Sequence, residues 1–169
     1  MPVLVKTPEE FIEEHGGRPL MSINDHEWLC KDGARMARWG HGTNFVEPPE
    51  NPREQLQLRL RYARWALSRA AGDFDKLKGG MLGRTGYSVF QWDERFYGEP
   101  APPDPKTCLT RLAEVARERK AAVESIETEY NSLPEVVEQQ RREEAARQAE
   151  REAAARHQKE LAEIGRITI

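Results

Sequence analysis

Cysteine is scarce in this sequence, and its hydrophobic runs are short. Cys30 and Cys108 are the two cysteines among 169 residues, and they form no Cys-x-x-Cys pair. A disulfide framework and a four-ligand zinc site are therefore both disfavoured. No stretch approaches the ~18 consecutive apolar residues of a membrane-spanning helix, and the opening MPVLVKTPEEF places acids directly after a short apolar run. These absences predict a soluble, cytoplasmic protein with reduced thiols and no membrane contact.

An excess of one sign of charge is also missing. The formal net charge is -3, with 26 basic and 29 acidic side chains, so no chain-wide positive field favours nucleic acid or an anionic membrane. Hydrophobic residues make up 38% and charged residues 33% of the chain, against usual shares of roughly 45–50% and about 25%. Such a composition indicates a large surface for the enclosed volume, which is typical of elongated helices.

Motifs for phosphate binding and catalysis are absent as well. The stretch KGGMLGRTGY, residues 78–87, has four glycines, but a Walker A loop would need glycine at Lys78 and lysine at Arg84. We interpret it as a helix stop and hinge. The sequence has no G-x-S-x-G and no H-E-x-x-H motif. We therefore expect no enzyme, no cofactor and no metal.

One small group of residues keeps a catalytic or metal-binding hypothesis open. His26, Cys30 and His41 are the cluster that most resembles metal ligands. Their spacing matches no zinc signature, and no fourth ligand is evident. An enzyme that uses these three residues is a third hypothesis, ranked behind the two given below.

Four segments begin with a short polar side chain followed by proline, a combination typical of helix N-termini. These segments are Thr7–Pro8, Asn51–Pro52, Asp104–Pro105 and Ser132–Leu133–Pro134. They predict helices at residues 8–15, 52–77, 105–131 and 134–164. The glycines after His15 mark the end of the first helix.

The region between the first two helices is expected to form a small sheet. Asp32–Gly33 is flanked by apolar residues in partial alternation, which predicts a β-hairpin turn. Two or three strands fit residues 20–39. The fold class is therefore mostly α, with a small N-terminal α+β unit that contains a β-hairpin and one long helix, followed by a C-terminal helical hairpin or coiled coil. The proline-rich segment 99–104 is the expected linker between domains 1–98 and 105–169.

The second helix is rich in arginine. Residues 53–84 hold eight basic and three acidic side chains, with Tyr62 and Trp65 interleaved. Leucine, alanine and aromatic residues lie on two nearly opposite faces, so the helix is expected to pack on two sides, its arginine stems covering apolar surface. The alternative is a nucleic-acid-binding accessory protein, in which arginines contact phosphates and rings stack on bases. The residues for that alternative are Arg61, Arg64, Lys76, Lys78 and Arg84.

An aromatic segment, residues 87–97, follows the glycines. It contains Tyr87, Phe90, Trp92, Phe96 and Tyr97, and residues 89–92 alternate as in a strand. Aromatic residues dominate protein cores, so the segment is expected to fold back and cover the Trp65 face of the second helix. Alternatively, Trp92, Phe96 and Tyr97 are exposed anchors for a protein partner.

The C-terminal helices carry an apolar seam with alternating spacings of three and four, which Arg119 interrupts. The seam residues are Leu109, Leu112, Val123, Ile126, Tyr130, Leu133 and Val137, and Ala116 completes the spacing between Leu112 and Arg119. This pattern predicts either a coiled coil or a single amphipathic helix on a globular core. Asn131–Pro134 is either a tight turn that closes an antiparallel hairpin or a kink in a continuous rod.

Beyond the seam, residues 141–157 have alanine as their only apolar residue. Acids stand four residues before bases, and EAAAR resembles semi-rigid helical spacers, so a solvated helix is expected. The tail 165–169 either adds a strand to a neighbour's sheet or frays.

Taken together, these features favour a non-enzymatic assembly, adaptor or structural protein. It acts through protein–protein contacts of its long helices, with a protein partner or as a homo-oligomer. The candidate partner-binding residues are the seam and the aromatics Trp92, Phe96 and Tyr97.

Overall fold

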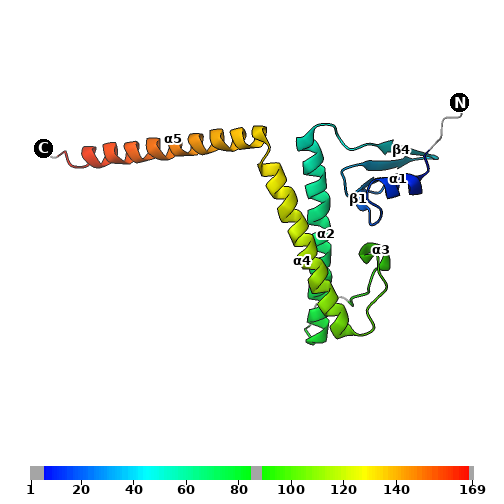
Figure 1. Ribbon diagram of the computed structural model, residues 1–169. Helices are drawn as coiled ribbons and strands as arrows, with labels where there is room; N and C mark the ends of the chain where they lie inside the picture. The colour runs from blue at the N-terminus through cyan, green and yellow to red at the C-terminus, as the bar shows by residue number, and fades with distance from the viewer. Residues whose placement is uncertain (1–5, 85–88, 168–169) are drawn as a thin grey trace, which may run out of the picture. The chain divides into compact units, whose positions relative to one another are not determined.

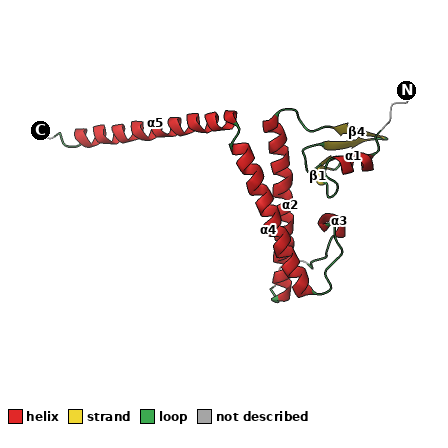
Figure 2. Cartoon of the chain, in the orientation of Figure 1, coloured by secondary structure: helices red, strands yellow, loops and turns green. Residues whose placement is uncertain are grey.

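The structure is a computed structural model that describes residues 6–84 and 89–167. The chain is mostly helical, with a four-stranded antiparallel sheet near the N-terminus followed by long helices (Figures 1 and 2), which confirms the expected fold class. It forms two compact units, residues 1–130 and 131–169. The proline-rich segment 99–104, where a boundary was expected, lies inside the first unit. Within the described ranges, no helix is both long and apolar enough to cross a bilayer.

The sheet is a meander of four strands in sequence order. They are β1 (Met21–Asn24), β2 (Glu27–Leu29), β3 (Arg35–Trp39) and β4 (Gly42–Val46). The Asp32–Gly33 turn joins β2 to β3, as the sequence predicts, and the Asp32 carboxylate accepts a hydrogen bond from the Ala34 amide at 3.0 Å. Strand β4 extends the sheet beyond the expected range of residues 20–39. It follows a two-residue turn in which Gly40 has φ +59° and Trp39 pairs with Gly42, a geometry typical of hairpins.

The two faces of the sheet are covered by different helices. Trp28, Met36 and Phe45 are cross-strand neighbours on one face, and they pack with Phe11 and Ile12 of α1 (Pro8–Glu14). On the other face, Leu29 clusters with Met21 and Ile23 against Tyr62 and Ala66 of α2 (Pro52–Met81). Period-two side-chain alternation thus gives this short sheet two apolar faces.

The end of α1 is tied to the sheet by a buried histidine. His15 is 6% exposed. Its Nδ1 lies 2.7 Å from Oδ2 of Asp32, and its Nε2 lies 3.1 Å from Oε2 of Glu47. The Phe11 ring of α1 stacks on the Phe45 ring of β4, with ring centres 4.7 Å apart. The centre of the His15 ring lies 4.3 Å from that of Phe11. Because Asp32 also caps the β2–β3 turn, one carboxylate holds the helix and the turn together.

Helix α2 begins where the cap chemistry predicts and ends later than expected. The Asn51 side chain accepts hydrogen bonds from the amides of Arg53 and Glu54. The helix continues through Gly79 and Gly80 to Met81, four residues beyond the expected end at 77. It stops at Gly83, which has φ +65° and donates to Gly80, while Arg84 donates to Gly79. This pair of bonds is a Schellman motif. Gly83, and not Gly79 or Gly80, therefore ends the helix.

The described part of the aromatic segment forms a short helix and no strand. Residues 89–92 have no regular structure, which corrects the strand-like expectation, and α3 (Glu94–Tyr97) follows. The Asp93 side chain accepts from the amides of Arg95 and Phe96, and Gly98 ends the turn with φ +73°. Asp93 therefore starts a helix at the point where the alternation breaks. Tyr87 lies outside the described residues.

Two further long helices complete the chain, α4 (Pro105–Asn131) and α5 (Pro134–Ile164). Their bounds agree with the expected 105–131 and 134–164. The Asp104 side chain accepts from the Thr107 amide, as expected of a cap. The N-cap of α5 is Leu133, which makes no side-chain cap bond, so the expected Ser132 cap is wrong because the proline shifts the helix start by one residue. Residues 168 and 169 of the tail lie outside the described ranges.

Two glycines provide a test of this fold, because the structure disfavours a larger side chain at one position and tolerates it at the other. Gly33 is buried with φ +100°, and an added Cβ would lie 3.4 Å from Cβ of Leu58. Gly72 lies within α2 with open space around it. We expect Gly33→Ala to lower the free energy of unfolding by about 1–3 kcal/mol through backbone strain. Gly72→Ala should raise it by up to about 1 kcal/mol. Urea denaturation measures the change in the free energy of unfolding for both variants. Changes of the same sign would contradict the backbone conformations assigned to the two glycines.

Candidate functional site

Arg119 of α4 is the contact point of three helices. Its guanidinium donates hydrogen bonds to the carbonyl oxygens of Ala66 in α2, at 2.9 Å, and of Phe96 in α3, at 3.3 Å. The guanidinium carbon also lies 4.2 Å from the centre of the Phe96 ring, within the range of a cation–π contact. Burial lowers the pKa of Arg119. The residue that interrupts the apolar seam therefore bonds α4 to both α2 and α3.

Phe96 is enclosed by the elements that surround α3. Its side chain is 1% exposed. The guanidinium carbon of Arg69 lies 4.0 Å from the ring centre, and the Trp65 ring meets it edge-on at 5.4 Å. Arg69 also pairs with Asp93. Partial burial raises the pKa of Asp93, but the hydrogen bonds from Arg69 and from the Phe96 and Arg95 amides, together with the Arg69 charge, outweigh it, so the pKa is lowered. The segment thus covers the Trp65 face of α2, as expected from its aromatic content.

The other two aromatic candidates are partly buried. Tyr97 donates a hydrogen bond to Oδ2 of Asp73 at 2.6 Å, and burial together with this bond raises the pKa of its hydroxyl. The indole of Trp92 donates to the Glu99 carbonyl at 2.9 Å, and its ring lies 4.3 Å from that of Tyr97. All three aromatics named as partner anchors therefore have contacts inside the first unit.

The seam residues of α4 lie in the first unit beside α2. Leu112 and Val123 are buried, and Leu109 and Ile126 are partly buried. The Tyr130 hydroxyl accepts hydrogen bonds from Arg53 at 3.3 Å and Gln57 at 3.2 Å. Up to Tyr130, then, the seam is part of an amphipathic helix on a folded core, one of the two expected alternatives. Leu133 and Val137 belong to the second unit, where Val137 is exposed.

The basic residues of α2 are partly neutralised by acids. Arg64 pairs with Glu127 at 2.7 Å and Arg59 with Glu129 at 3.3 Å, which adds two cross-links to α4. Lys76 lies 3.6 Å from Asp73. Lys78 stands 5.5 Å from the Phe74 ring centre, while Arg61 and Arg84 are exposed. The five residues of the nucleic-acid alternative thus do not form one uniformly available cationic surface.

The His26, Cys30 and His41 cluster is not assembled in the structure. His26 and His41 are exposed in the turns before β2 and β4, whereas Cys30 is buried beyond the other end of β2. The His26 ring packs near Trp39 instead, with ring centres 5.3 Å apart. Across residues 6–84 and 89–167, no three His, Cys, Asp or Glu side chains are grouped to hold a metal ion. Burial raises the pKa of the Cys30 thiol to about 11.

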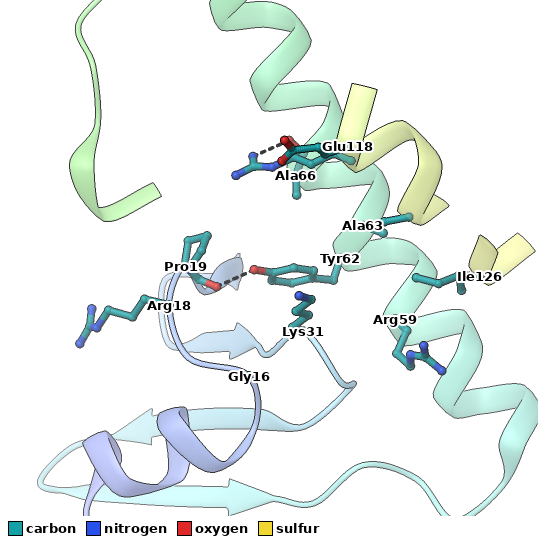
Figure 3. A pocket seen from close by; sticks show the side chains of 12 residues that line it. Gly16, Arg18, Pro19, Lys31, Arg59, Tyr62, Ala63, Ala66, Glu118 and Ile126 are labelled. Carbon is teal, nitrogen blue, oxygen red and sulfur yellow. Dashed lines mark hydrogen bonds between the residues drawn. The ribbon is translucent and has the colours of Figure 1, made fainter. Parts of the chain in front are cut away.

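A cavity of about 320 Å³ lies between α2, α4 and the segment that joins α1 to β1 (Figure 3). Its apolar wall is formed by Tyr62, Ala63, Ala66, Ala122 and Ile126. The Tyr62 hydroxyl donates to the Pro19 carbonyl at 2.8 Å, which joins the two sides of the cavity. Its charged lining consists of Arg18, Lys31, Arg59, Arg119 and Glu118. Periodicity could not reveal this site, because its walls come from residues as distant as Gly16 and Ile126.

Helix α5 is exposed along most of its length. Every residue from 139 to 167 is exposed. One face of α5 carries apolar or weakly polar side chains at spacings of three and four: Ala146, Ala149, Ala153, His157, Leu161 and Ile164. Exposed fractions of 54% for Leu161 and 63% for Ile164 leave the end of this face open to solvent.

The role of Arg119 can be tested by truncation. We expect Arg119→Ala to lower the free energy of unfolding by about 2–3 kcal/mol, because hydrogen bonds made by a charged group contribute roughly 1.5–3 kcal/mol. Arg117→Ala, an exposed change two residues earlier, should stay within about 0.5 kcal/mol of the parent. Urea denaturation followed by tryptophan fluorescence gives both values. Equal effects would show that Arg119 is not a special contact.

The thiol of Cys30 should be inert in the folded chain. A pKa of about 11 leaves on the order of 0.1% thiolate at pH 8, and the thiolate is the reactive species. In a Cys108→Ser variant, Ellman's reagent should therefore react slowly under native conditions and quickly in urea. Fast labelling of the native variant would instead support the hypothesis of an enzyme that uses Cys30.

Comparison with known proteins finds no relative of this chain. No family model matches the chain, and neither the curated proteins nor the solved structures contain a match.

Proposed function

We propose that the chain is a non-enzymatic assembly protein whose subunits join through contacts of the long helix α5. The observation that carries this proposal is the continuous exposure of residues 139–164 along a 31-residue helix. At ~1.5 Å per residue, such a helix is about 46 Å long. A protein–protein contact along one face of it would supply the burial that the helix lacks by itself.

The chemistry of α5 suits a helical partner. Alanines at positions 146, 149 and 153 allow a second helix to approach closely, and Leu161 and Ile164 add larger apolar side chains at the end. Helices pack through such stripes when side chains at spacings of three and four interdigitate. Glu138 and Arg142, joined at 2.9 Å, exemplify the ion pairs that keep the remaining surface hydrated.

Charge supports a second copy of the chain as the partner. The helix carries eight acidic and six basic side chains, with the two signs interspersed. Two copies would therefore meet without strong mutual repulsion. The α4 seam offers less for this purpose, because Leu112 and Val123 are buried within the first unit.

The nucleic-acid alternative draws less support from the contacts. It requires positive charge that is free to meet phosphates. Arg64 and Lys76 are already in ion pairs with carboxylates of the same unit. The alternative therefore depends chiefly on Arg61, Lys78 and Arg84, which are exposed, and Arg61 stands far from the other two along the sequence.

Two alanines of the EAAAR segment provide a matched test. Ala153 lies on the apolar face of α5, and Ala155, about 200° further around the helix, lies on the opposite face. Sedimentation equilibrium of the full chain should show self-association. We expect Ala153→Glu to raise its dissociation constant at least tenfold, since a desolvated carboxylate disfavours the contact, and Ala155→Glu to leave it unchanged.

Helicity must be equal in the two variants for this comparison, and circular dichroism checks that requirement. A parent chain that remains monomeric at every concentration would contradict the proposal. Equal weakening by both substitutions would show that the association does not use this face.

A further inference from the structure

The cavity between α2, α4 and the α1–β1 segment has an unusual charge balance. Four basic side chains line it, Arg18, Lys31, Arg59 and Arg119, with Glu118 as the one acidic residue of the lining. The whole chain has more acids than bases, so this surplus is local. A concave surface that carries charge of one sign attracts ligands of the opposite charge.

The nearby carboxylates do not balance the surplus. Glu118 lies 3.2 Å from Arg111, and Glu129 lies 3.3 Å from Arg59. In the described part of the chain, Arg18, Lys31 and Arg119 make no ion pair with a carboxylate. The hydrogen bonds of Arg119 go to two backbone carbonyls. Since a guanidinium has five N–H donors, three remain for another acceptor.

The remainder of the cavity is apolar and roomy. The lining includes three small side chains, Ala63 and Ala66 on α2 and Ala122 on α4. Figure 3 shows the Tyr62 ring beside Ala63 as a wall of the cavity. Because the Tyr62 hydroxyl already donates to Pro19, the ring contributes mainly an apolar surface. A volume of about 320 Å³ falls at the lower end of the range for small-molecule sites, roughly 300–1,000 Å³.

We propose that this cavity binds a small organic oxyanion, a carboxylate or phosphate ester, that carries an apolar body. The oxyanion is held by Lys31 and Arg119, and the apolar body lies against the alanines of α2 and α4. Arg18 extends away from Tyr62 at the rim (Figure 3), where it adds attraction at longer range. This binding site lies within the first unit and is independent of the assembly proposed for α5.

Three probes of similar size separate charge from shape. Phenyl phosphate and benzoate carry the two kinds of oxyanion, and benzyl alcohol is the neutral counterpart. At concentrations about ten times the dissociation constant, either bound anion should raise the melting temperature of the full chain by about 3–6 °C. Benzyl alcohol should not raise it. Isothermal titration calorimetry then gives the affinities, and the tighter anion identifies the preferred head group.

Matched variants locate the binding. Ala122→Trp fills the cavity, whereas Ala121→Trp changes an exposed neighbour that does not line it. Lys31→Glu reverses a lining charge, whereas Arg38→Glu reverses an exposed charge on β3. We expect Ala122→Trp and Lys31→Glu each to weaken anion binding at least tenfold, and the two controls to bind like the parent chain.

Three kinds of result would overturn the proposal. If neither anion binds, the cavity is not a site for this class of ligand. Equal affinity for benzyl alcohol would show that charge plays no part. Equal binding by Ala122→Trp and Ala121→Trp, or by Lys31→Glu and Arg38→Glu, would place the anion elsewhere on the surface.

Discussion

The first unit depends on a positive charge placed where an apolar side chain would be expected. Arg119 lies in the middle of an otherwise apolar stripe, and its guanidinium bonds to carbonyls of two other helices while covering the Phe96 ring. An isolated buried charge is costly, so this arrangement requires α3 to be in place. Helix α2 in turn has the sheet against one face and α4 against another. The sheet, the aromatic helix and α4 are thus held through a common central helix.

This arrangement separates the two activities proposed for the chain. Packing on α2 uses most of the apolar surface of α4, and it also creates the cavity, since alanines on both helices leave a gap between them. The second unit contributes a helix with no buried side chain after residue 138. Binding a small anion and joining subunits therefore use different residues, and variants in one should leave the other intact.

Local chemistry made much of the fold predictable. Proline next to Asn51 or Asp104 marks helix starts, and the Asp32–Gly33 turn marks a hairpin, because each acts on neighbouring backbone groups. Strand β4 escaped prediction because Thr43 and Asn44 weaken its alternation, leaving the turn at Gly40 as its main signal. Periodicity showed that α4 has an apolar face but not that α2 covers it. The contacts of Arg119 and the cavity were out of reach, since they depend on residues brought together from separate parts of the chain.

The exposure of the side chains of α5 also bears on how the chain tolerates changes in length. Where side chains are exposed and the backbone bonds only to itself, added residues meet no neighbour to displace. Seven extra residues near Ala149 would lengthen the helix by about 10.5 Å and rotate its remaining face by only about 20°. The length of this segment can therefore be changed in steps of two turns without repacking the core.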